Sequence, residues 1–92
     1  MEKQIEAYLR NEVKKRGGLA LKFVSPGTAG VMDRILLIQG GLAIFVETKS
    51  TGKQLRPLQV AMKRKFEALG FRCEVIDSKE QVKTLINEIY TT

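Results

Sequence analysis

Two short stretches decide the fold of this 92-residue chain: Gly30-Val31-Met32-Asp33-Arg34 and Glu47-Thr48-Lys49. Apolar residues fill positions 35–38 and 42–46 between them, and Gln39-Gly40-Gly41 interrupts the run. A glycine pair between two apolar segments predicts a tight β-hairpin. Asp33 then begins one strand and Glu47 ends the next, so their two carboxylates are expected at the same end of the ribbon.

Strand alternation predicts which of these side chains project together. Residues i and i+2 on a strand point to the same face. We therefore expect Glu47 and Lys49 to lie on one face, close to Asp33, with Thr48 directed away from them. An acid that starts one strand would meet an acid and a lysine that end its neighbour.

Outward from the hairpin, hydrophobic periodicity predicts the remaining elements. Apolar residues at helical spacing predict a first helix that ends at Gly17-Gly18. The segments 19–24, 31–38, 42–49 and 71–76 read as strands, and 25–30 and 50–56 as loops. A second helix is expected from Pro57 to Gly70, and a third after a capping box of Ser78 and Gln81. The predicted order is αβββαβα, an α/β fold with a mixed sheet in a single small domain, residues 1–92.

Composition excludes several kinds of chemistry. The chain has no histidine and one cysteine, Cys73, so serine–histidine or cysteine–histidine catalysis, a disulfide within the chain and a histidine or thiolate zinc site are excluded. We expect Cys73 to be a buried small apolar residue. The net charge of +6 favours a polyanionic partner. Apolar runs are far shorter than the roughly 20 residues of a membrane span, so we expect a cytoplasmic protein without membrane association.

Two carboxylates at close range need a cation. Mg²⁺ takes oxygen ligands and commonly uses one or two carboxylates plus water. A lysine beside such an ion can position or deprotonate an attacking water, or stabilise negative charge that develops on phosphorus. The alternative is purely structural: Asp33 and Arg34 would form a surface ion pair, and Glu47 and Lys49 a cross-strand charge pair.

The pattern resembles the PD-(D/E)xK nuclease superfamily and, within it, the short stand-alone, phage-type members of the VRR-NUC family. Almost the whole chain carries the resemblance, through Gly17-Gly18-Leu19, Lys22-Phe23, Ser25-Pro26-Gly27, Gly30-Val31, Asp33-Arg34, Phe45-Val46-Glu47, Lys49, Pro57-Leu58-Gln59 and Leu69-Gly70-Phe71. It implies a restriction-endonuclease-like core in the predicted element order. Met32 stands where the family usually has proline, so we expect altered loop rigidity there without loss of chemistry.

The resemblance also implies roles for individual residues. Asp33 and Glu47 are expected to bind Mg²⁺ or Mn²⁺, together with the backbone carbonyl of Thr48. Lys49 corresponds to the catalytic lysine. Gln59 corresponds to a glutamine that helps arrange the site. The acid of the first helix is Glu6, with Glu2 as its close competitor.

Cations follow the proposed site in the sequence. Positions 49–65 hold six lysines and arginines and no acid. We expect Lys53 and Arg56, in the loop, to contact DNA phosphates, with Lys22 and Arg34 as secondary contacts. The loop 25–30 lacks the lysine–hydroxyl ending of a P-loop, so no nucleotide cofactor is expected.

The sequence thus predicts a metal-dependent DNA endonuclease that hydrolyses phosphodiester bonds. Its small size favours recognition of branched DNA, such as a Holliday junction or flap, by a homodimer in the cytoplasm of a bacterial or phage-infected host cell. The alternatives are a non-catalytic DNA-binding module and a nuclease subunit that needs a larger partner.

Overall fold

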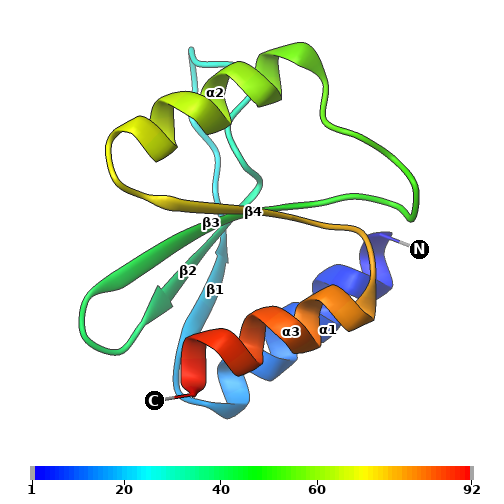
Figure 1. Ribbon diagram of the computed structural model, residues 1–92, viewed down its shortest axis with the longest axis vertical. Helices are drawn as coiled ribbons and strands as arrows, with labels where there is room; N and C mark the ends of the chain where they lie inside the picture. The colour runs from blue at the N-terminus through cyan, green and yellow to red at the C-terminus, as the bar shows by residue number, and fades with distance from the viewer. Residues whose placement is uncertain (1, 92) are drawn as a thin grey trace.

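A computed structural model describes residues 2–91; Met1 and Thr92, the boundaries of the expected domain, lie outside the described residues. Its elements follow the predicted order: α1 (Glu2–Lys15), β1 (Leu19–Lys22), β2 (Arg34–Ile38), β3 (Leu42–Thr48), α2 (Pro57–Ala68), β4 (Arg72–Ile76) and α3 (Lys79–Tyr90). Figure 1 shows the sheet as a central layer, with α2 on one side and α1 and α3 on the other. The predicted α/β class with a mixed sheet is confirmed.

The four strands lie in the order β1-β2-β3-β4. The first two pairings are antiparallel, whereas β3 and β4 are parallel and are joined through α2. The β2–β3 hairpin turns at Gly40 and Gly41, whose φ angles are +86° and +78°. Two consecutive residues in this left-handed region match the tight turn that the glycine pair predicted.

Each face of the sheet has its own apolar cluster, because alternate strand residues point to opposite sides. Between the sheet and the helices α1 and α3 lie fully buried side chains from both layers, among them Leu9, Leu36, Ile44, Val46 and Val82. Under α2 lie Met32, Phe45 and Cys73, with Phe23 and Phe66 packed against them. The buried Cys73 agrees with the sequence prediction.

The strands β1, β2 and β3 are shorter than predicted. β1 ends at Lys22 and β2 begins only at Arg34, although Phe23 N–H still donates to the Asp33 carbonyl (2.8 Å). β3 ends at Thr48, and Lys49 N–H donates to the Ile76 carbonyl (2.8 Å). Strand pairing therefore continues for one bond at each of these ends, which are where Asp33 and Lys49 lie.

The start of α3 also differs in detail from the predicted capping box. Ser78 Oγ accepts from Gln81 N–H (3.2 Å), as expected of the N-cap. The Gln81 side chain, however, accepts from Asp77 N–H (2.6 Å) rather than from Ser78. Asp77, the residue before the N-cap, is thus also hydrogen-bonded to the first turn of α3.

Within residues 2–91, no helix is both long enough and apolar enough to cross a membrane.

Candidate active site

The hairpin brings Asp33 and Glu47 together. Arg34, the first residue of β2, pairs with Val46 in β3. Asp33, which precedes Arg34, and Glu47, which follows Val46, therefore meet at the same end of the hairpin. Glu47 Oε1 accepts a hydrogen bond from the backbone N–H of Asp33 (3.1 Å). Glu47 is buried and Asp33 half-buried, so both carboxylates are partly withdrawn from water.

Thr48 binds Asp33 through two groups. Its backbone N–H donates to Asp33 Oδ1 (3.3 Å) and its hydroxyl donates to Oδ2 (3.1 Å). The Thr48 side chain was expected to face away from Glu47 and Lys49, and its contact with Asp33 was not predicted. Asp33 precedes the regular part of β2, so strand alternation does not fix its side chain, which reaches the hydroxyl of the fully buried Thr48.

Gln59 and Lys49 both approach the second oxygen of Glu47. Gln59 Nε2 donates to Glu47 Oε2 (3.1 Å), and Lys49 Nζ lies 3.6 Å from the same oxygen. Gln59 is buried on the first turn of α2, and its own oxygen accepts from Arg56 N–H (2.9 Å). The amide therefore has a fixed orientation, with its donor end at Glu47.

The surroundings raise the pKa of both carboxyls. Burial is the main cause of the raised pKa of Asp33; the charge of Glu6 adds to it, while hydrogen bonds from Thr48 and the charge of Arg34 oppose it. Burial is also the main cause of the raised pKa of Glu47, followed by the charge of Asp33, with Lys49 opposing. The two ionised groups thus repel each other in a partly desolvated place.

Glu6 reaches the site through Arg34. Its Oε1 accepts from Arg34 Nε (3.1 Å) and from Arg34 Nη2 (2.9 Å), which ties α1 to the first residue of β2. Glu2 makes no hydrogen bond or ion pair with any of these side chains in the described part of the chain. The structure therefore brings Glu6, rather than Glu2, next to the carboxylate cluster. Arg34 was predicted as a secondary DNA contact. Its side chain is only 13% exposed and forms an ion pair with Glu6.

The other predicted DNA contacts lie on the surface. Lys22, Lys53 and Arg56 are exposed, and within residues 2–91 none of them forms an ion pair. Arg56 immediately precedes α2 and caps it, three residues before Gln59. The start of α2 therefore connects the exposed Arg56 to the carboxylate cluster through Gln59.

The donor set fits a hard divalent cation in its chemistry. Two carboxylates with raised pKa values repel each other, and a cation between them would offset that repulsion. Over residues 2–91 no three acidic, histidine or cysteine side chains cluster as metal ligands. Any ion held here would thus depend on Asp33 and Glu47, with backbone or water oxygens completing its shell.

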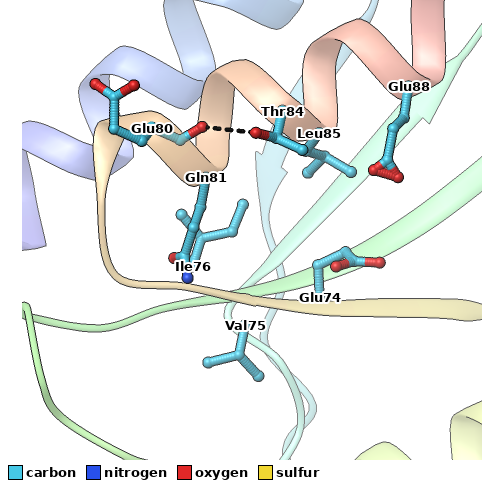
Figure 2. Close-up of a pocket in the computed structure, with 8 residues that line it drawn as sticks. All are labelled: Glu74, Val75, Ile76, Glu80, Gln81, Thr84, Leu85 and Glu88. Atoms are coloured by element: carbon cyan, nitrogen blue, oxygen red, sulfur yellow. Dashed lines mark hydrogen bonds between the residues drawn. The ribbon is translucent and has the colours of Figure 1, made fainter.

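A second group of acids, on the opposite side of the sheet, is a poor metal site. A groove of about 250 Å³ lies between β4 and α3. Figure 2 shows Glu74, Glu80 and Glu88 around it and Val75 pointing to the other face of the sheet. Arg72 Nε lies 2.8 Å from Glu74, and Arg72 Nη2 lies 2.9 Å from Glu88. Arg72 thus already neutralises Glu74 and Glu88, and Lys83 Nζ lies 3.7 Å from Glu80.

Sequence reasoning missed two features of the site, the Thr48 hydroxyl and the Glu6–Arg34 pair. The hydroxyl lies on a residue whose carbonyl alone was given a role, because its side chain was expected to face away from Glu47 and Lys49. The pair joins residues 28 positions apart, and no local spacing reveals it. A hint was available in Arg34 itself, since an arginine at the start of an apolar strand needs an anionic partner once it is partly buried.

Comparison with known proteins places this geometry in a family. No protein-family model matches the chain. It is 44% identical over 79 residues to "Putative nuclease p44" of Acyrthosiphon pisum secondary endosymbiont phage 1, a match that covers 86% of this chain and 85% of the relative. A solved structure described as a VRR_NUC domain superposes with a TM-score of 0.91 and 28% sequence identity, over 97% of each chain. The fold, the carboxylate–lysine cluster and these relatives agree: the chain belongs to the VRR-NUC family of nucleases.

Proposed function

We propose that this protein is a divalent-metal-dependent endodeoxyribonuclease whose active site is the cluster of Asp33, Glu47, Lys49 and Gln59. The observation that carries the proposal is Glu47 Oε2, which meets both the Gln59 amide (3.1 Å) and the Lys49 ammonium (3.6 Å) beside a second carboxylate. A purely structural ion pair has no need of a second, half-buried acid that raises the pKa of the first. The nuclease p44 relative supports the same chemistry.

Asp33 and Glu47 would hold Mg²⁺ or Mn²⁺, with the backbone carbonyl of Thr48 as a further ligand. When bound, such an ion polarises the phosphate and lowers the pKa of water. The side chain of Thr48 fixes Asp33 through the 3.1 Å hydroxyl bond, and Gln59 fixes Glu47. Both ligands are therefore oriented before DNA arrives, which preserves the geometry of the site.

Lys49 acts next to the scissile phosphate. Its ammonium is a compact point charge within reach of Glu47, so it can orient the attacking water or stabilise charge on the phosphoryl oxygens. Glu6 has a positioning role, since it holds Arg34 and, through β2, the backbone next to Asp33. Lys53, Arg56 and Lys22 contact phosphates that flank the cut, and Arg34 stays a secondary candidate.

We further propose that the substrate is branched DNA, of the Holliday-junction or flap type, and that the enzyme works as a homodimer in the bacterial or phage-infected cytoplasm. No element beyond the αβββαβα core is present in residues 2–91 to read base sequence. Leu19, Leu21 and Leu37 leave exposed apolar surface on the sheet face that carries α2, near the edge strand β1. A two-fold partner would cover it and supply a second site for a second strand.

The test is cleavage of plasmid, four-way junction and flap DNA with Mg²⁺ or Mn²⁺, with EDTA as the metal-free control. Lys49→Ala should lower the rate by about 10²–10³-fold, because it removes one preorganised charge from the transition state. Lys83→Ala, on the opposite side of the sheet, is the matched control and should cut normally. Circular dichroism checks that both variants fold.

Three results would contradict the proposal in different ways. Normal cleavage by Lys49→Ala would remove the site assignment. Binding without cleavage of all three DNAs would favour a non-catalytic DNA-binding module. Weak wild-type cleavage that rises on addition of host lysate fractions would favour a subunit that needs a larger partner.

A further inference from the structure

A cavity of 450 Å³ lies directly beside the candidate active site. It is formed by two segments distant in the sequence: the glycine-containing loop before β2 and the first turn of α2. The residues that line it are Ala29, Gly30, Arg56, Pro57, Leu58 and Gln59. This volume falls within the range of about 300–1,000 Å³ found for small-molecule sites.

The two walls are in tight backbone contact. Gly30 has φ +88°, and a Cβ atom at this position would lie 2.5 Å from the carbonyl oxygen of Leu58. Only glycine therefore allows the loop to approach α2 this closely. The cavity is thus a fixed feature of how the loop seats on the helix, not a gap left by loose side chains.

Gln59 connects the cavity to the chemistry. Gln59 is one of the residues that line it, and its side-chain amide donates to Glu47 Oε2 (3.1 Å). Whatever occupies the cavity therefore lies one side chain away from the proposed metal ligands. For a strand with its phosphate at Glu47 and Lys49, the neighbouring nucleotide is the part within reach.

The lining of the cavity is mostly apolar, whereas a phosphate-binding site would require positive charge. Alanine, glycine, proline and leucine form most of it, and the side chain of Leu58 is 63% exposed. Arg56 adds one cation at the rim, without an ion-pair partner in residues 2–91. The apolar parts of DNA are the faces of its bases, and a protein wall reaches these faces only when a base leaves its stack.

We propose that this cavity receives an unstacked nucleobase next to the scissile phosphate, with Leu58 and Pro57 against the base and Arg56 at the adjoining phosphate. The inference rests on the proposed nuclease function and extends it. It assigns the preference for branched DNA to a physical step, because bases at a branch or in a single-stranded arm are already partly unstacked. In fully paired DNA a base must first leave its stack, which costs free energy.

The experiment follows unstacking directly. Y-shaped DNAs carry the fluorescent base 2-aminopurine at one position each through the branch, since its emission rises when neighbours no longer stack on it. All proteins contain Lys49→Ala, so that the DNA stays intact in Mg²⁺. The parent should raise emission at one position, and Leu58→Ser should abolish that rise and weaken binding by at least about fivefold, the lower end of base-stacking effects.

Leu69→Ser is the matched control. Leu69 directly follows α2 as its C-terminal cap, is also exposed (75%), and does not line the cavity. It should keep both the emission change and the affinity. An abasic nucleotide at the responding position should make the parent and Leu58→Ser bind equally.

The outcomes separate the two proposals. Cleavage by the wild type with no responding position, or equal losses in Leu58→Ser and Leu69→Ser, would overturn the base pocket and leave the nuclease function intact. A responding position that depends on Leu58, in a wild type that never cuts, would overturn the nuclease function and support the pocket.

Discussion

At the scale of single residues, the candidate site holds two carboxylates, Asp33 and Glu47, that repel each other when ionised. Asp33 and Glu47 are partly withdrawn from water, and each has a raised pKa. A raised pKa in the folded state means that the ionised group destabilises the fold. The stability present below the unfolded pKa is lost as the pH rises through the folded pKa. The metal-free protein should therefore become less stable as the pH rises and both carboxyls ionise.

Asp33→Asn should consequently raise the melting temperature of the metal-free protein at pH 7. Near pH 3, where the wild-type carboxyl is protonated, the difference should disappear. Mg²⁺ or Mn²⁺ should raise the wild-type melting temperature and leave that of Asp33→Asn unchanged. Thermal melts in EDTA and in each metal measure all three effects. An Asp33→Asn variant that still responds to metal would contradict the ligand assignment.

Met32 shows how a residue without chemistry can support one that has it. It precedes Asp33 and is 1% exposed, in the cluster with Phe45 and Cys73. A methionine thus anchors the backbone at the position where the family usually has proline. Packing here holds the loop in place of a fixed φ angle.

Met32→Ala should therefore lower the free energy of unfolding by about 2–5 kcal/mol, the usual cost of a cavity in a core. Met62→Ala, at a half-buried methionine of α2, should cost less. Urea denaturation of the two variants gives the comparison. Equal losses would show that the Met32 side chain is not a specific anchor.

At the scale of elements, the seating of the loop on α2 rests on one glycine. Gly27 and Gly30 both have positive φ angles, +81° and +88°. A Cβ at Gly27 would meet nothing within 4 Å, whereas at Gly30 it would clash with the Leu58 backbone. The pair thus separates backbone strain from close approach.

Gly27→Ala should cost about 1–2 kcal/mol, the price of a left-handed backbone alone. Gly30→Ala should cost more and should also slow DNA cleavage, because the loop must move away from α2 and from Gln59. Denaturation and cleavage rates, measured on both variants, test this. Equal stability and equal rates would refute the close-approach argument.

The elements themselves were predictable, and the reasons are local. The Gly40-Gly41 turn fixed the hairpin, and strand alternation then placed Glu47 and Lys49 on one side of it, as the 3.6 Å contact agrees. The ends of the strands and the contacts of Thr48 and Arg34 were not predictable. They depend on where pairing stops near Asp33 and on α1, 28 residues away, which no periodicity records.

At the scale of the whole molecule, the exposed leucines of β1 and β2 bear on assembly. Leu19 pairs with Leu37 across the strands, and the two side chains are 55% and 40% exposed. Leu37→Lys should shift a homodimer toward monomer, with little loss of monomer stability. Leu42→Lys is the control, because Leu42 is equally exposed (45%) but lies on the other face of the sheet. Analytical ultracentrifugation over a concentration series gives the result, and a wild type that is monomeric at micromolar concentration would refute the dimer.

The predicted phosphate contacts can be counted by salt dependence. Lys53→Ala should reduce the slope of log affinity against log salt by about 0.9, the value for one phosphate contact on duplex DNA. Lys83→Ala should leave the slope unchanged. Fluorescence anisotropy at several salt concentrations measures both. An unchanged slope in Lys53→Ala would remove this residue from the DNA interface.

The acidic groove between β4 and α3 has an effect at a distance as well. Positions 72–90 hold four carboxylates and three cations, and α1 on the same side of the sheet holds three carboxylates and four cations, while positions 49–65 hold six cations and no acid. These segments include α3 and α2, which lie on opposite sides of the sheet (Figure 1). The molecule is therefore an electric dipole, and the field of a nearby polyanion rotates it so that α2 leads. This orienting torque acts before contact and over roughly a Debye length, about 10 Å at 0.1 M salt, so it favours encounters in which the carboxylate–lysine side faces a polyanion.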